Sequence, residues 1–78
     1  MKPGSRKKWI RVRSSAVREV RYDRNRRKLA VRYLSGEPYE YFNVPRSKFR
    51  ALLGAESKGR FVNERIKPNH PFKKLPAG

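Results

Sequence analysis

The clearest chemical signal in the sequence is a run of cations, in which Arg24, Asn25, Arg26, Arg27 and Lys28 follow one another. A charged run is usually just a solvated turn, but four cations in five residues repel one another unless an anion lies near. The phosphates of a nucleic acid supply such anions, and binding them releases counterions, which favours association without any special fit. We therefore predict that this run is a turn that contacts phosphate.

Two tyrosines, Tyr39 and Tyr41, are spaced so that they share one face of a strand. If that face is open, they could stack on two bases, as aromatic side chains do in RNA-binding sheets. If it is covered, they supply the apolar surface that a packed helix needs. We favour the covered arrangement and keep base stacking as the alternative. A mixed role is also open, because a buried tyrosine can still hold its hydroxyl at the rim.

The single tryptophan, Trp9, stands among the cations Lys7, Lys8 and Arg11. An indole ring can close one end of a small core, and it can also stack on an exposed base. The sequence favours neither role over the other.

Catalytic chemistry has no comparable signal. His70 is the only histidine and the chain has no cysteine, so neither a metal site nor a disulfide framework is expected. The six carboxylates are scattered among cations and are typical of ion-pair partners, whereas Ser14 and Ser15 have no base nearby and fit a turn or cap. We expect no enzyme activity and no cofactor.

The overall charge points the same way as the cation run. The chain has 78 residues, of which 22 are Lys or Arg and 6 are Asp or Glu, for a net charge of +16. Residues 1 to 32 carry +11 of this excess and residues 33 to 78 carry +5. No stretch is apolar enough to span a membrane or to act as a signal peptide, so we expect a cytoplasmic protein with a polyanionic partner.

The expected elements are strands first and helices after them. Three segments rich in Val, Tyr and Phe, residues 17 to 22, 28 to 34 and 38 to 43, predict antiparallel strands, and residues 9 to 13 could add a short fourth. Pro45 suits the first position of a helix that ends near Gly54 and covers the sheet with Phe49, Leu52 and Leu53.

A second helix and two termini complete the expected layout. Ser57 could cap a helix that carries Phe61 and Ile66 and ends before Pro68. Residues 1 to 8 are read as a flexible basic arm, residues 9 to 72 as the domain and residues 73 to 78 as a tail. The prolines after residue 67 should prevent regular structure there, while Phe72 and Leu75 pin the extended chain to the domain. The predicted fold is α+β, an antiparallel meander of three or four strands followed by one or two helices on one face.

Turn lengths predict which side chains share a face. If residues 24 to 27 form a four-residue loop, the first hairpin pairs Tyr22 with Leu29 and Val20 with Val31. These four apolar side chains then lie on the same side of the sheet.

The second hairpin extends this apolar face. A three-residue loop ending at Gly36, with that glycine in the left-handed region, would pair Val31 with Tyr39 and Leu29 with Tyr41. A two- or four-residue loop would reverse the faces of the third strand. The opposite, solvated face would carry Glu19, Arg21, Lys28, Ala30, Arg32, Glu40 and, as its apolar exception, Phe42.

A wider pattern extends from residue 10 to residue 72. It comprises Ser14, Ser15, Ala16, Val17, Val20, Tyr22, Asp23, Leu29, Ala30, Val31, Gly36, Tyr39, Glu40, Tyr41, Val44, Pro45, Ser57, Gly59, Phe61, Ile66 and Lys67. Together these residues resemble the KTSC domain, a family named from a segment at the C-terminus of some lysyl-tRNA synthetases and also found as small bacterial proteins. The resemblance implies RNA binding. His70 departs from it, since an aromatic residue is expected before the proline.

These observations predict a small domain that binds nucleic acid mainly through its phosphates. RNA is preferred to DNA because of the resemblance, and we expect a monomer that does not bind membranes. The alternative is a protein interaction module that docks on an acidic partner or assembly. The expected contact residues are Arg6, Lys7, Lys8, Trp9, Arg11, Arg21, Arg24, Arg26, Arg27, Lys28 and Arg32.

Overall fold

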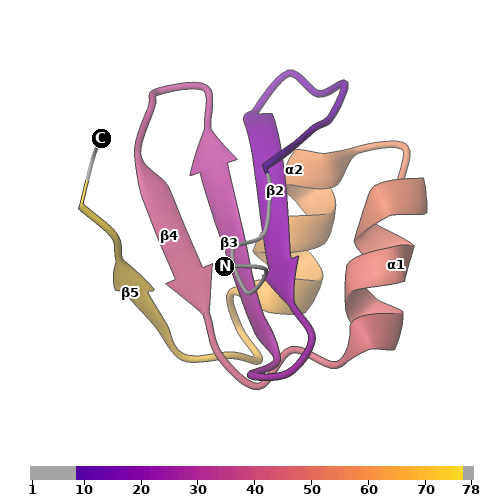
Figure 1. The fold of residues 1–78 in the computed structure, drawn as a ribbon. Helices are drawn as coiled ribbons and strands as arrows, with labels where there is room; N and C mark the ends of the chain where they lie inside the picture. Colours follow the sequence, from indigo (N-terminus) through magenta and orange to yellow (C-terminus); the bar gives the residue numbers. More distant parts are fainter. Residues whose placement is uncertain (1–8, 77–78) are drawn as a thin grey trace, which may run out of the picture.

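A five-stranded antiparallel sheet with helices on one side forms the protein (Figure 1). The computed structural model describes residues 9–76. The strands lie in the order in which they occur along the chain: β1 (Ile10–Arg11), β2 (Val17–Asp23), β3 (Lys28–Tyr33), β4 (Pro38–Tyr41) and β5 (Phe72–Lys74). The α+β class, the meander and the short strand at residues 9 to 13 are confirmed, although the sheet has one strand more than predicted.

The predicted hairpin register is correct in both hairpins. Strand β2 pairs Val20 with Val31 and Tyr22 with Leu29 across a four-residue turn. Strand β3 pairs Val31 with Tyr39 and Leu29 with Tyr41. Gly36 has a φ of 99°, a backbone conformation that side chains disfavour, and this allows the short three-residue loop. The two tyrosines therefore lie on the apolar face.

The helical region follows β4 along the chain. Helix α1 (Arg46–Gly54) is followed by α2 (Lys58–Phe61), which continues directly into a π-helical turn, η1 (Val62–Ile66). The Ser57 side chain caps α2 as predicted, with its Oγ accepting from the Arg60 amide at 3.2 Å. The helix limits of α1 are shifted by one residue, because Pro45 is extended at ψ 153° and stands before the helix, while Gly54 is its last residue.

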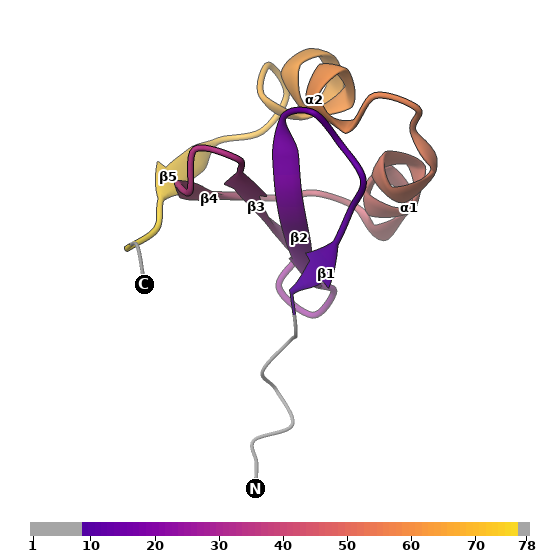
Figure 2. The same cartoon turned by 90° about the horizontal axis from the view of Figure 1, so that it is seen from above.

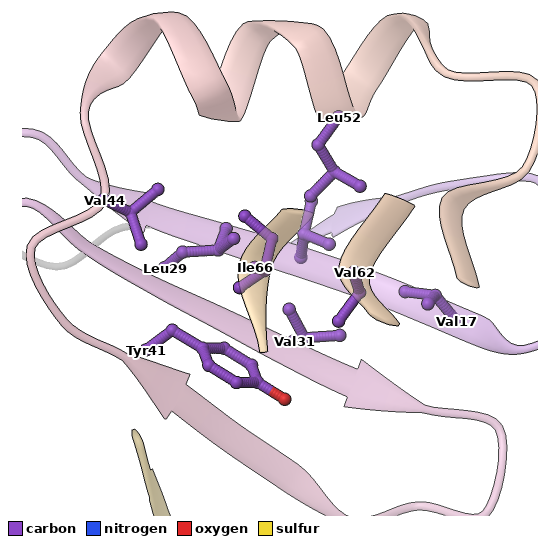
Figure 3. Packing of buried hydrophobic residues seen from close by; sticks show 9 residues of the cluster. Val17, Leu29, Val31, Tyr41, Val44, Leu52, Val62 and Ile66 are labelled. Atoms are coloured by element: carbon purple, nitrogen blue, oxygen red, sulfur yellow. The ribbon is translucent and has the colours of Figure 1, made fainter. Parts of the chain in front are cut away.

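The core lies between the sheet and the helices (Figure 3). Phe49 stacks on Tyr22 with ring centroids 4.7 Å apart, and Leu52 is fully buried. Leu53 was expected to cover the sheet as well but is 37% exposed, because the neighbour of a buried helical residue points 100° away from it. The fully buried aliphatic residues are Val17, Val20, Leu29, Val31, Val44, Leu52, Val62 and Ile66.

Helix α2 approaches the chain before β2 very closely. A β-carbon added to Gly59 would lie 2.8 Å from the Cβ of Ala16. Ala16 belongs to a turn held by Ser14, whose Oγ accepts from the amides of Ala16 and Val17 at 3.1 Å. The turn role expected for Ser14 is thus confirmed, and it places Ala16 against the helix.

The prediction that prolines prevent regular structure after residue 67 is wrong for Phe72–Lys74. This segment pairs with β4 as β5, with Phe72 opposite Tyr41 and Lys74 opposite Tyr39. The three-residue strand fits within the four residues between Pro71 and Pro76, and as an edge strand β5 leaves one side of its backbone unpaired, where proline is tolerated. The strand also crosses the boundary expected at residue 72.

Candidate nucleic-acid interface

One face of the sheet carries no helix. Figure 2 shows α1 and α2 on the same side, with β1 and the start of the described chain away from them. Because side chains alternate along a strand, the residues between the buried ones point to this open face. Two rows of paired positions cross it: Arg21, Ala30, Glu40 and Lys73 in one, and Arg11, Glu19, Arg32 and Pro38 in the other.

Trp9 lies on the open face and contacts two arginines. The guanidinium carbons of Arg21 and Arg32 lie over its ring, 4.5 Å and 4.8 Å from the ring centroid. Stacking of this kind leaves the N–H groups at the edge of a guanidinium able to bind phosphate. Of the two roles left open for Trp9, closing one end of the core does not fit this position, and the ring instead holds two cations in place.

Arg32 is further oriented by its neighbours. Its Nε donates to Glu19 Oε2 at 2.9 Å, and its Nη1 donates to the Gly36 carbonyl at 3.4 Å. Arg21, in contrast, has no carboxylate partner among the described residues. The pair thus combines one arginine held in place with one whose charge is uncompensated.

The expected solvation of the open face needs one correction. Ala30 is only 2% exposed, and Pro38 is fully buried although it lies on the same side. Both are small, and the long side chains around them on neighbouring strands cover them. Leu75 continues the pairing of β5 with β4, since its amide donates to the Pro38 carbonyl at 2.9 Å.

Lys28 sits at the far end of the open face and is partly neutralised. Its Nζ lies 3.9 Å from Glu40 Oε1 and 5.4 Å from the centre of the Phe42 ring. Phe42, the apolar exception on this face, therefore makes a cation–π contact with Lys28. Lys73 joins the same surface from β5, and no pattern in the sequence could place it there because that strand was not predicted.

The turn between β2 and β3 has a rigid backbone and exposed cations. Asp23 Oδ1 accepts from the amides of Asn25 and Arg26 at 3.0 and 3.2 Å, and the Arg27 carbonyl accepts from the Val44 amide at 2.9 Å. Arg24, Arg26 and Arg27 are exposed, and none pairs with a carboxylate within the described residues. Their side chains are not used to hold the turn, so they can contact an anion.

The expected arm residues Arg6, Lys7 and Lys8 lie outside the described residues. They precede Trp9 directly, and the alternating register places Trp9 beside Arg21 on the open face. The described chain thus brings together the sheet cations and Trp9 on one surface. The arginine turn lies at the end of this surface, where it joins β2 to β3.

Tyr39 and Tyr41 point to the helix side, which confirms the favoured interpretation of Tyr41 as a core residue. Tyr41 is 1% exposed, whereas Tyr39 is only half-buried. The Tyr41 hydroxyl lies 2.7 Å from that of Tyr33, and burial raises the pKa of both phenols above its usual value. Both stay protonated at neutral pH. A hollow of about 340 Å³ opens above them, lined by Tyr33, Tyr39, Tyr41, Lys67 and Phe72.

His70, to which no chemistry was assigned, docks the segment before β5. Its Nδ1 donates to the Phe42 carbonyl at 3.0 Å, and its Nε2 accepts from Lys48 Nζ at 3.0 Å. Burial and the Lys48 ammonium lower the pKa of the imidazole, which favours this neutral form. A polar side chain thus does the docking expected of an aromatic one.

Residues 9–76 offer neither a metal site nor a membrane-spanning helix. No group of three or more His, Cys, Asp or Glu side chains there could hold a metal ion. No helix of that region is long and apolar enough to cross a bilayer.

Comparison with known proteins gives a consistent set of relatives. The family described as the KTSC domain matches residues 13–70. A protein of Tsukamurella paurometabola is 47% identical over 57 residues, which are 73% of this chain and 85% of that one. The crystal structure of a KTSC domain protein from Yersinia pestis superposes with a TM-score of 0.87 at 28% identity, covering 91% of this chain and all of that one.

A third relative is much longer. A lysine–tRNA ligase of Nostoc punctiforme is 33% identical over 66 residues, which span 85% of this chain but 12% of the ligase. The chain therefore corresponds to a small segment of that enzyme.

Proposed function

We propose that this chain, which belongs to the KTSC domain family, is a non-catalytic domain that binds nucleic acid on the open face of its sheet. The observation that carries the proposal is the pair Arg21 and Arg32 held over Trp9. Guanidinium groups fixed in this way lose little side-chain freedom when they bind phosphate, so each contact costs less than one from a mobile lysine.

The charge of the surrounding surface supports the same ligand. The open face and the arginine turn carry many more cations than carboxylates, and Glu19 and Glu40 are already paired with Arg32 and Lys28. Uncompensated charges repel one another and are stabilised by a polyanion. Nucleic acid satisfies this requirement with evenly spaced phosphates along one strand.

RNA is the preferred class of nucleic acid. Relatives named lysine–tRNA ligase contain a segment similar to nearly the whole of this chain, and tRNA is the nucleic acid in their name. We extend that association to this chain and place it in the cytoplasm, where RNA is available. The 2′-hydroxyl would distinguish RNA from a DNA strand of the same sequence.

The test combines a double variant with a charge-matched control. Arg11→Gln with Arg21→Gln removes two open-face cations that have no carboxylate partner in the described chain. Arg50→Gln with Arg60→Gln removes two exposed cations from the helices instead. Affinity for a single-stranded RNA is measured by fluorescence anisotropy across a range of salt concentrations, and folding is checked by thermal melting.

The expected results follow from counterion release. About six phosphate contacts give a slope of log affinity against log salt near −4, and removing two of them should reduce it to about −2.8. The helix control should keep the parent slope. Equal losses in both variants would mean that total charge, and not the open face, determines binding.

An acidic protein or assembly is the second candidate, because the same uncompensated cations on the open face would attract acidic side chains. Both candidates predict retention on heparin that falls with salt, so competition must separate them. If excess tRNA or single-stranded RNA displaces the captured partner, and nuclease treatment of half the sample removes it, the partner is RNA. Capture that survives both treatments would favour the protein.

A further inference from the structure

The helices leave part of their own side of the sheet uncovered. Figures 1 and 2 show α2 next to β2 and α1 beyond it, with β4 and β5 at the opposite end of the sheet. There the side chains of Tyr33, Tyr39 and Phe72 surround the hollow of about 340 Å³, which is at the lower limit of the size of ligand pockets. Phe72 is 57% exposed and forms its rim, while the buried Tyr41 ring forms its floor at the edge of the core (Figure 3).

The ring geometry of the hollow is suited to a flat ligand. Tyr39 lies edge-on to Tyr33 at 5.8 Å and is tilted by 58° to Phe72 at 5.7 Å, while Phe72 is tilted by 44° to Tyr41. The rings therefore line the walls and are not stacked face to face on one another. A planar group in the hollow could contact the rings of Tyr39 and Phe72, which line it.

The floor has a hydroxyl group that can donate a hydrogen bond to a ligand. The hydroxyls of Tyr33 and Tyr41 lie 2.7 Å apart, and one of them donates to the other. Two phenols carry two hydroxyl protons, so the second proton needs another acceptor, and no described residue provides one. A ligand with a carbonyl or ring-nitrogen acceptor at its edge would satisfy it.

The rim is cationic. Lys67 Nζ lies 5.4 Å from the centre of the Tyr33 ring and has no carboxylate partner among the described residues. Lys74 is also close by, at the position paired with Tyr39, but Glu37 Oε2 neutralises it at 3.1 Å. The uncompensated charge beside the rings is thus that of Lys67, which favours an anionic ligand.

We infer that this hollow binds one unstacked nucleotide, with its base against the aromatic rings and its phosphate at Lys67. This inference rests on the proposed function, to which it adds a second contact on the opposite face of the sheet. A planar base, an acceptor on its edge and an attached phosphate match the rings, the free hydroxyl proton and the lysine in turn. A second copy of the chain is disfavoured as the occupant because both copies would carry a charge of +16.

The probe is uridine 5′-monophosphate, titrated into the isotope-labelled full chain and followed by NMR. We expect the aromatic and amide resonances of Tyr33, Tyr39, Lys67 and Phe72 to shift together, whereas inorganic phosphate alone should leave the ring resonances unchanged. Phe72→Leu keeps an apolar side chain at this exposed position but removes a ring, and it should weaken nucleotide binding on the order of tenfold. Lys67→Gln should weaken it as well, and Lys67→Arg should restore it.

Three controls make the outcome decisive. Leu34→Ser changes another exposed apolar residue outside the hollow and should bind the nucleotide like the parent. The Arg11→Gln, Arg21→Gln variant should also keep nucleotide binding in the hollow even if its RNA affinity falls, so failure of the open-face proposal is recognised separately. The inference is overturned if the nucleotide leaves the ring resonances unchanged or Phe72→Leu binds it normally. It is equally overturned if these resonances shift on dilution of the protein alone, because a second copy would then occupy the hollow.

Discussion

The helix side of the sheet buries Leu29, Val31 and Tyr41 almost completely, whereas the open side of the same strands carries Arg21 and Arg32 over Trp9. Alternation along each strand therefore assigns neighbouring residues to different tasks. A residue on the covered face contributes to folding through the apolar contacts it makes, and its neighbour on the open face contributes little to folding. Substitutions on the two faces should consequently have separable effects.

The largest loss of stability is expected from truncating a large buried side chain on the covered face. Tyr41→Ala removes a buried ring and should lower the free energy of unfolding by about 3 to 5 kcal/mol. Tyr41→Phe keeps the ring but loses the hydroxyl contact with Tyr33, and should cost only about 1 kcal/mol. Urea unfolding followed by circular dichroism measures both. If Tyr41→Ala folded normally but lost RNA binding, the assignment of the two faces would have to be exchanged.

The next effect tests how tightly the helices press on the covered face. Alanine in place of a helical glycine ordinarily stabilises by about 1 kcal/mol, but Gly59→Ala should destabilise because its Cβ would lie 2.8 Å from that of Ala16. Neither β-carbon can rotate away, so the backbones must separate, at a cost of roughly 1 to 3 kcal/mol.

A second substitution provides the control for this contact. Ala16→Gly combined with Gly59→Ala exchanges which chain carries the methyl group and should recover much of the lost stability in thermal melting. Destabilisation that Ala16→Gly does not relieve would place its cause elsewhere in the helix.

The sequence predicted those parts of the two faces that depend on residues close together in the chain. Both hairpin turns are short and have characteristic residues, so the pairing of Val20 with Val31 and of Leu29 with Tyr41 followed from counting loop residues. Ser57 was recognised as a cap for the same reason. In contrast, β5 contains only three residues between two prolines, and its pairing partner is more than 30 residues away in the chain.

Features that depend on distant contacts escaped prediction. The position of Trp9 is determined by the pairing of β1 with β2, which brings its ring beside two arginines from other strands. The aromatic hollow needs Phe72 from β5, and the docking role of His70 needs Lys48 from α1. None of these partners is near in sequence, so residue type and spacing alone could not indicate them.

Substitutions in the arginine turn should affect RNA binding and leave stability almost unchanged. Replacing Arg24, Arg26 and Arg27 with Ser should weaken binding to all RNA sequences alike, because phosphate contacts carry no sequence information. Three lost contacts should reduce the salt slope by about 2, whereas the melting temperature should stay close to the parent's, since Asp23 and backbone bonds hold the turn. Anisotropy with two unrelated RNA sequences and a thermal melt measure this. A marked loss of folding would instead assign the arginines a structural role.

The smallest effect concerns His70, which joins the two layers at the end of β4. In the folded chain the pKa of the imidazole is lowered by burial and by Lys48, while in the unfolded chain it should be near its ordinary value of about 6.5. The unfolded state therefore binds more protons as the pH falls below about 6.5, so this contribution to stability is present above that pH and is lost below it. Because the ring is only partly buried, we expect less than about 1 kcal/mol.

The measurement for His70 compares melting temperatures between pH 7.5 and pH 5, above the range in which most carboxylates titrate. The parent should lose stability over this range, and His70→Gln should lose less because glutamine does not ionise. Lys48→Met removes the nearby ammonium, so it should raise the pKa of His70 toward its ordinary value and make the loss of stability smaller. An NMR titration of the His70 ring that gave a pKa above 6.5 would contradict the neutral bridge, because the imidazole would then carry a proton facing Lys48.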